Sequence, residues 1–263
     1  MDICQKMETG MADYAHKAAT TGSIYLETVT EYDLYCHYVA GLVGEGLSRL
    51  FAASGKEEAF LAQQLELSNS MGLLLQKTNI IRDFREDCDQ RRYFWPQEIW
   101  GKAEYGFKEI NEMCSTDQNT VTRATWVQSG MILNALGHAI DALDYLRLLK
   151  NQSIFNFCAI PAAMAIATLE LCFMNKEMFQ RNIKIRKAEA AAVRLKPLSP
   201  PITWITNLVL YSLSCGQKTR ERLALFSGSM QGGSMQRPFH RTQISFEFLW
   251  LVARFALSQH LLT

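Results

Sequence analysis

The segment LQKTNIIRDFREDCDQRRYFWPQE, residues 75–98, carries a dense run of charged side chains at the end of an apolar helical pattern. Its acids Asp83, Glu86 and Asp87 are spaced i, i+3 and i+4, which places them on one face of an α-helix. The stripe beside them is apolar and includes Ile80. The spacing therefore predicts a helix with one side in a protein core and a continuous acidic face on the other.

The acidic face has two interpretations. Neighbouring carboxylates repel one another, and Mg²⁺ offsets this repulsion because it binds carboxylate oxygens while substrate phosphates complete its octahedron. Gln76 and Asn79 share the acidic arc of about 100°, and Arg82 flanks it, where a guanidinium can hold the same phosphate group. The alternative is a solvated face on which arginines pair with the acids.

Composition favours a globular protein without a strong overall charge. The chain has 263 residues, of which 48% are hydrophobic, and its formal net charge is +1. Such a balance gives no general attraction to nucleic acid, so no nucleic-acid partner is expected. Its 7 cysteines form no C-x-x-C pair and are scattered through apolar runs, which indicates reduced thiols rather than a structural zinc site.

The apolar periodicity predicts an all-α fold, because long stretches repeat at helical spacing and alternating strand patterns are nearly absent. The clearest loop is expected over 89–119. Helices are expected over 1–19, 31–54, 57–88, 120–149, 153–174 and 176–195.

The chain divides into three parts by composition. Residues 1–195 are expected to form a helical domain, and 196–243, rich in Ser, Gly and Gln, are expected to form a linker or irregular tail. The apolar stretch 244–263 has about the length of a membrane span, but Glu247 and Arg254 interrupt it, so it predicts at most a weak membrane-associated segment. The N-terminus lacks the apolar run of a secretory signal.

Four blocks of the sequence resemble successive motifs of the squalene synthases, the farnesyl-diphosphate farnesyltransferases. The resemblance runs in order from about residue 1 to residue 187 and implies the helical bundle of the isoprenoid synthases, incomplete at its N-terminal side. The blocks are YCHYVAGLVGEGLSRLF at 35–51, NSMGLLLQKTNIIRDFRED at 69–87, RRYFWPQEIW at 91–100 and NQSIFNFCAIPAAMAIATL at 151–169.

The resemblance implies a two-step reaction that uses Mg²⁺ and NADPH. Two farnesyl diphosphates condense to presqualene diphosphate, which is then rearranged and reduced to squalene. By position, the resemblance assigns catalysis to Tyr35 and Phe157, metal binding to Asp83, Glu86 and Asp87, cofactor binding to Arg82, Lys184 and Arg186, and substrate binding to Gln76, Asn79, Phe155, Cys158 and Pro161.

The aromatic residues among these suit the chemistry that the resemblance implies. Loss of diphosphate leaves a carbocation, which needs a dry cavity and aromatic faces rather than anions that would trap it. Phe155 and Phe157 fit this requirement, and the resemblance gives Tyr35 a role through its hydroxyl as proton acceptor or through its ring. Pro161 is expected to kink its helix at the deep end of the cavity.

Other conspicuous residues are expected to be structural. Gly41, Gly44 and Gly46 interrupt a helix and follow no strand, so they predict close approach of helices rather than a phosphate-binding loop. His37 and His138 lie in apolar helical surroundings and are expected to be hydrogen-bonded core histidines.

The family places a second acidic motif upstream of the region that corresponds to residue 1, and this sequence holds only one D-x-x-E-D. The resemblance implies a monomer that binds farnesyl diphosphate on the cytosolic face of the endoplasmic reticulum membrane. Two alternatives remain open. One is a non-catalytic remnant that binds a prenyl diphosphate or a partner, and the other is an enzyme similar to phytoene synthases, against which Lys184 and Arg186 argue modestly.

Overall fold

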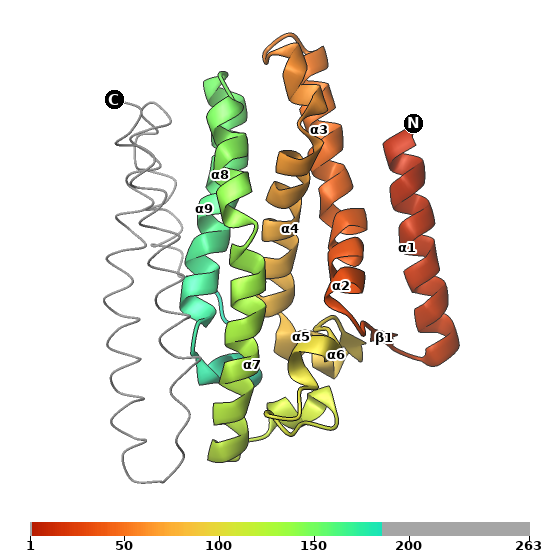
Figure 1. The fold of residues 1–263 in the computed structure, drawn as a ribbon, viewed down its shortest axis with the longest axis vertical. Coiled ribbons are helices and arrows are strands. Elements are labelled where there is room, and N and C mark those ends of the chain that lie inside the picture. The colour runs from red at the N-terminus through yellow and green to blue at the C-terminus, as the bar shows by residue number, and fades with distance from the viewer. Residues whose placement is uncertain (1, 186–263) are drawn as a thin grey trace. The chain divides into compact units, whose positions relative to one another are not determined.

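A computed structural model describes residues 2–185, which belong to a first compact unit, Met1–Lys196. The predicted linker 196–243 and segment 244–263 lie outside the described residues. The predicted all-α class is confirmed (Figure 1). The α-helices are α1 (Asp2–Thr21), α2 (Val29–Cys36), α3 (Leu42–Ala53), α4 (Leu65–Arg82), α5 (Phe84–Asp89), α6 (Gln97–Trp100), α7 (Gln118–Leu136), α8 (Ala139–Leu148) and α9 (Gln152–Cys172).

Helix α4 is the centre of the described part. It packs against α3, α7, α8 and α9, and in Figure 1 it lies between the ribbons of α3 and α8. Leu74 and Ile81 are fully buried, and the serines and glycine of its first half are buried as well. A helix enclosed on most sides is apolar around most of its circumference, which explains why α4 shows little contrast between two faces.

The predicted helix over 57–88 is wrong as a single helix. A 3₁₀ turn, η2 (Ala59–Gln63), precedes α4, and the chain leaves helical geometry at Asp83, where φ is −92° and ψ is 11°. The predicted helix over 31–54 contains a π-helical segment, η1 (His37–Gly41), between α2 and α3. The hydrophobic pattern continues through both positions and therefore does not reveal them.

Two further boundaries differ from the prediction. The helix expected over 120–149 is divided at Gly137 and His138, between α7 and α8. The helix expected over 176–195 is wrong where the structure describes it, because only the 3₁₀ turn η4 (Lys176–Phe179) forms before residue 185. The remainder of that range lies outside the described residues.

The predicted loop 89–119 is more ordered than expected. It contains α6, the 3₁₀ turn η3 (Ile110–Cys114) and strand β2 (Arg92–Tyr93). Strand β2 pairs in parallel with β1 (Ile24–Tyr25). The Leu26 N–H donates to the Tyr93 carbonyl at 3.3 Å and extends the pairing. This pairing ties the chain before α2 to the chain after α5.

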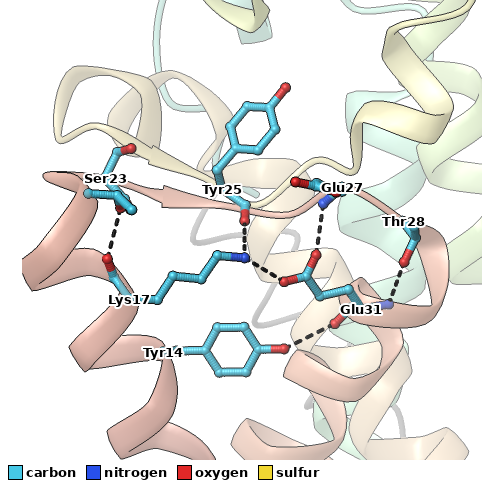
Figure 2. A network of polar contacts seen from close by, with 8 residues as sticks. Tyr14, Lys17, Ser23, Tyr25, Glu27, Thr28 and Glu31 are labelled. Carbon is cyan, nitrogen blue, oxygen red and sulfur yellow. Dashed lines mark hydrogen bonds and ion pairs between the residues drawn. The ribbon is translucent and has the colours of Figure 1, made fainter.

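A network of polar contacts joins α1 to the start of α2 (Figure 2). Lys17 Nζ donates to Glu31 Oε1 at 2.8 Å and to the Tyr25 carbonyl at 3.2 Å. The Glu27 N–H donates to Glu31 Oε2 at 2.9 Å, and Thr28 caps α2 by accepting from the Glu31 N–H. Glu31 therefore fixes both the turn before α2 and the end of α1.

Helix α9 is the one helix within residues 2–185 whose length and apolarity would allow it to cross a membrane. However, 61% of its apolar window is buried inside the protein, as in the core helix of a globular domain. Pro161 lies inside α9 and is exposed.

Close backbone approach explains three of the glycines. A Cβ at Gly41 would clash with Asn69 Oδ1, and a Cβ at Gly44 would clash with the Ser68 carbonyl, which confirms the predicted role of these two residues. Gly72 of α4 lies even more directly against backbone, since a Cβ there would stand 2.5 Å from the Ala40 carbonyl oxygen. Gly46 has room for a side chain, so the prediction is wrong at that position.

The different surroundings of Gly72 and Gly46 predict that replacement by alanine has opposite effects on stability at the two positions. Gly72→Ala should lower the free energy of unfolding by about 1–3 kcal/mol, because α4 must move away from η1. Gly46→Ala, whose Cβ would meet only the Ile3 side chain at 3.7 Å, should raise it by up to about 1 kcal/mol through helix propensity. Urea unfolding followed by far-UV circular dichroism measures both, and equal effects would contradict the close contact.

Candidate functional site

The acidic motif lies at the junction of α4 and α5. Asp83 is half-buried, Glu86 is exposed and Asp87 is buried. Although Asp83 interrupts the helix, its N–H still bonds to the Asn79 carbonyl, and the Asp87 N–H bonds to the Asp83 carbonyl, both at 2.9 Å. The chain thus keeps a helical path through the break, and the acids remain i, i+3 and i+4 neighbours.

Two arginines neutralise two of these acids. Arg82 Nε and Nη2 donate to the two carboxylate oxygens of Asp83 at 2.8 and 2.5 Å. Arg92 Nε and Nη2 donate to Asp87 Oδ1 at 3.1 and 2.6 Å. Such charge-assisted pairs hold each carboxylate in a defined orientation.

The sequence pattern alone does not single out Arg92 as a site residue. Its approach to Asp87 depends on Arg91, which adopts the left-handed conformation with φ of 57°. This conformation reverses the chain after α5 and returns Arg92 to the acids five residues before it. An arginine pair directly after D-x-x-E-D is the available signal, and its meaning depends on the turn.

Burial changes the pKa of the Asp87 carboxyl group. Desolvation raises the pKa of this carboxyl to about 6, and the nearby charges of Asp83 and Glu86 act in the same direction, while the ion pair with Arg92 opposes them. Additional positive charge beside Asp87 would favour the ionised form.

Tyr35 lies close to this acidic group. Its ring is buried, stacks on Phe94 with centroids 4.9 Å apart, and meets the edge of Tyr14 at 5.0 Å. Burial, followed by the charges of Cys36 and Asp87, raises the pKa of the Tyr35 hydroxyl to about 12. The hydroxyl is consequently neutral and able to accept or donate a proton in a hydrogen bond.

The donor set fits Mg²⁺ bound through phosphate and water rather than through a protein cage. Within residues 2–185, no three His, Cys, Asp or Glu side chains converge to hold a metal ion. Carboxylates are nevertheless the ligands that Mg²⁺ prefers, usually one or two together with substrate phosphates and water. Both hydrogen bonds from Arg92 end on Oδ1 of Asp87, and Glu86 is exposed.

The predicted cofactor segment reaches the same group. Asn182 Nδ2 donates to Glu86 Oε2 at 3.0 Å, which brings the chain just before Lys184 to the acidic motif. Lys184 itself is exposed, and Arg186 lies outside the described residues. Asn182 carries no sequence signal that would have marked it.

The predicted substrate residues divide between two helices. On α4, Gln76 is half-buried and lies two turns before Asp83, and Asn79 is exposed and lies one turn before Asp83. On α9, Phe155 is buried and Cys158 is half-buried.

Phe157, also on α9, is 58% exposed and lies edge-on to Phe51 of α3 at 6.2 Å. Helix α9 packs against α4. The roles assigned to these residues, and to Pro161 on the same helix, stay predictions.

Comparison with known proteins identifies the family. The family model described as squalene/phytoene synthase matches residues 1–189. A squalene synthase of Ganoderma lucidum is 62% identical over 208 residues, which are 76% of this chain and 44% of that protein. A squalene synthase of Mus musculus is 46% identical over 200 residues, 76% of this chain and 45% of that protein.

A solved structure agrees with this result. The complex of TcSQS with the ligand E5700 matches with a TM-score of 0.79 and 34% identity, covering 98% of this chain and 67% of that one. The predicted resemblance to squalene synthase and the isoprenoid synthase fold are thus confirmed. The chain spans less than half the length of the curated relatives named above. It belongs to the squalene/phytoene synthase family.

Proposed function

We propose that this chain serves as a farnesyl-diphosphate farnesyltransferase of the squalene synthase type. Two farnesyl diphosphates would condense to presqualene diphosphate, which is reduced to squalene with NADPH. The observation that supports this most is the junction of α4 and α5, where a buried Asp87 bound by Arg92 lies near the stacked ring of Tyr35.

The acidic motif would hold the leaving diphosphate. Asp83, Glu86 and Asp87 are the residues that would bind Mg²⁺, which neutralises the departing diphosphate when bound. Arg82 and Arg92 lie beside them and can turn from carboxylate to phosphate, because a guanidinium binds both in bidentate fashion.

Tyr35 would act on the prenyl chain beside this group. Its neutral hydroxyl can donate or accept a hydrogen bond there, and the stacked pair with Phe94 offers aromatic surface to a cationic chain. Phe155 and Phe157, with Cys158 and Pro161 beside them on α9, would contact the prenyl chain.

The reductive step would use the segment after η4. NADPH supplies the reducing equivalents when bound. Lys184, two residues after the amide that contacts Glu86, and Arg186 are the residues that would bind its phosphate. We further propose a monomer at the cytosolic face of the endoplasmic reticulum membrane, on the basis of the family and of the apolar stretch 244–263.

A binding protein without turnover is the second candidate. It rests on the same acidic motif, because one D-x-x-E-D among these 263 residues can hold one diphosphate. Incubation with farnesyl diphosphate, Mg²⁺ and NADPH separates the two functions. Release of diphosphate with formation of squalene supports the enzyme, and binding without release supports the second candidate. A 40-carbon product from geranylgeranyl diphosphate would indicate the phytoene type.

Substitution of one acid tests the diphosphate site. Asp87→Asn should weaken Mg²⁺-dependent binding of inorganic diphosphate by at least about tenfold, because a charged ligand of the cation is lost. Isothermal titration calorimetry measures the affinity. Asp89→Asn is the matched control, since Asp89 is exposed and pairs with Arg85, and its affinity should stay within about twofold of the unsubstituted chain. Equal losses in both variants would contradict the assignment.

The raised pKa of Asp87 also predicts a pH-dependent stability. A carboxyl whose pKa is raised to about 6 by folding stabilises the protein while protonated, and this contribution is lost as pH rises from about 4 through 6. The unfolding free energy of Asp87→Asn minus that of the unsubstituted chain should therefore increase by about 1 kcal/mol between pH 4 and 7. Thermal unfolding across this range measures it. A constant difference would contradict the raised pKa.

A further inference from the structure

A lysine is buried in the middle of the described core. The side chain of Lys77, on α4, is 0% exposed. Its Nζ lies 2.5 Å from Asp33 Oδ1 on α2, 2.6 Å from Asn134 Oδ1 on α7 and 2.8 Å from Nε2 of His138, the residue directly before α8. One side chain thus connects four helices.

These neighbours match what an ammonium group requires. A lysine ammonium has three N–H donors and no acceptor, and three acceptor atoms surround it here. The ring of Tyr32 adds a cation–π contact, with its centroid 5.1 Å from Nζ. Lys77 therefore forms an ion pair with Asp33 and hydrogen bonds with Asn134 and His138.

His138 completes the group as a neutral acceptor. It accepts from Lys77 at Nε2, which leaves the ring proton on Nδ1. Burial, and then the charge of Lys77, lower the pKa of His138 to about 4, so this acceptor persists at neutral pH. The predicted role of His138 as a hydrogen-bonded core residue is confirmed.

The contact between Lys77 and Asp33 joins the helix that carries Tyr35 to the helix that ends at the acidic motif. Asp33 precedes Tyr35 by two residues on α2, and Lys77 precedes Asp83 by six residues on α4. Directly after α2 the chain enters the π-helical segment η1. Such π-helical segments are rare and interrupt the regular α-helical hydrogen bonding, so the contacts of Asp33 lie directly before an irregular part of the chain.

We propose that Lys77 is a positioning residue, whose shared ammonium group holds α2 in a fixed rotation on α4 and thereby sets the place of the Tyr35 ring relative to Asp87. The role of Tyr35 in catalysis rests on the proposed function, whereas the link between the helices does not. A buried ion pair adds little net stability over apolar packing, so its value here lies in orientation. A lysine that served stability alone would not control Tyr35 specifically.

Fluorine NMR of protein labelled with 3-fluorotyrosine tests this directly. The chain has 9 tyrosines, and Tyr35→Phe identifies the resonance of Tyr35. Lys77→Met removes the ammonium and keeps the length of the side chain. Asp33→Ala removes only the α2 end of the link, at a side chain that is 40% exposed, and leaves Asn134 and His138 as partners of the ammonium.

Tyr145→Phe is the matched control. It removes the buried 2.7 Å hydrogen bond between Ser48 of α3 and Tyr145 of α8, which is an interhelical contact of similar burial. Lys77→Met and Asp33→Ala should shift or broaden the Tyr35 resonance, whereas Tyr145→Phe should lower the melting temperature and leave that resonance in place. Loss of melting temperature in all three variants with an unchanged Tyr35 resonance overturns the proposal.

The functional readout is the release of diphosphate from farnesyl diphosphate. In Lys77→Met and Asp33→Ala, kcat should fall by about tenfold or more while KM stays within about twofold, because the reacting groups are displaced rather than removed. The double variant should be no slower than Lys77→Met, since both substitutions break one link. If the unsubstituted chain releases no diphosphate, the proposed function as an enzyme fails, and the fluorine spectra alone decide the positioning role. Unchanged spectra in Asp33→Ala overturn it.

Discussion

Direct backbone contact between α4 and η1 is the constraint on which the rest of the described structure depends. Gly72 offers no side chain, so α4 lies against the Ala40 carbonyl at a distance that any larger residue would increase. Because η1 continues α2 into α3, this contact sets the separation between the helix of Tyr35 and the helix that ends in the acids. Close approach leaves no room for water, so polar groups at this level need partners within the protein, as Lys77 has.

The carboxylates of the acidic motif are stabilised by separate partners. They are not gathered around one point but are satisfied one at a time, Asp83 by Arg82, Asp87 by Arg92 and Glu86 by Asn182. Like charges on one helical face are tolerated because each has its own partner. Asp87 is the buried one of the three acids, and its desolvation outweighs the ion pair with Arg92, which raises its pKa.

The helical class and the acidic face follow from periodicity, since apolar spacing around Leu73 and Ile80 has one helical solution. Four features have no such signal. The break at Asp83 leaves the hydrophobic pattern intact, and strands of two residues, as in β1 and β2, are too short to show alternation.

The approach of Arg92 depends on a positive φ at Arg91, which a residue other than glycine rarely adopts. The burial of Lys77 was likewise hidden, because a lysine between Gln76 and Thr78 looks like part of a polar face. The approach of Arg92 and the burial of Lys77 depend on tertiary packing, which the spacing of residues along the sequence does not describe.

The pairing of Arg82 and Arg92 with carboxylates has a consequence for ionic strength. A magnesium diphosphate entering this site would find the charges of Asp83 and Asp87 already matched by arginines within the protein. Its binding would be an exchange, in which the guanidinium groups would turn from carboxylate to phosphate and the carboxylates would be free to hold the metal. Since similar numbers of charges are screened before and after such an exchange, added salt perturbs both sides of the equilibrium comparably.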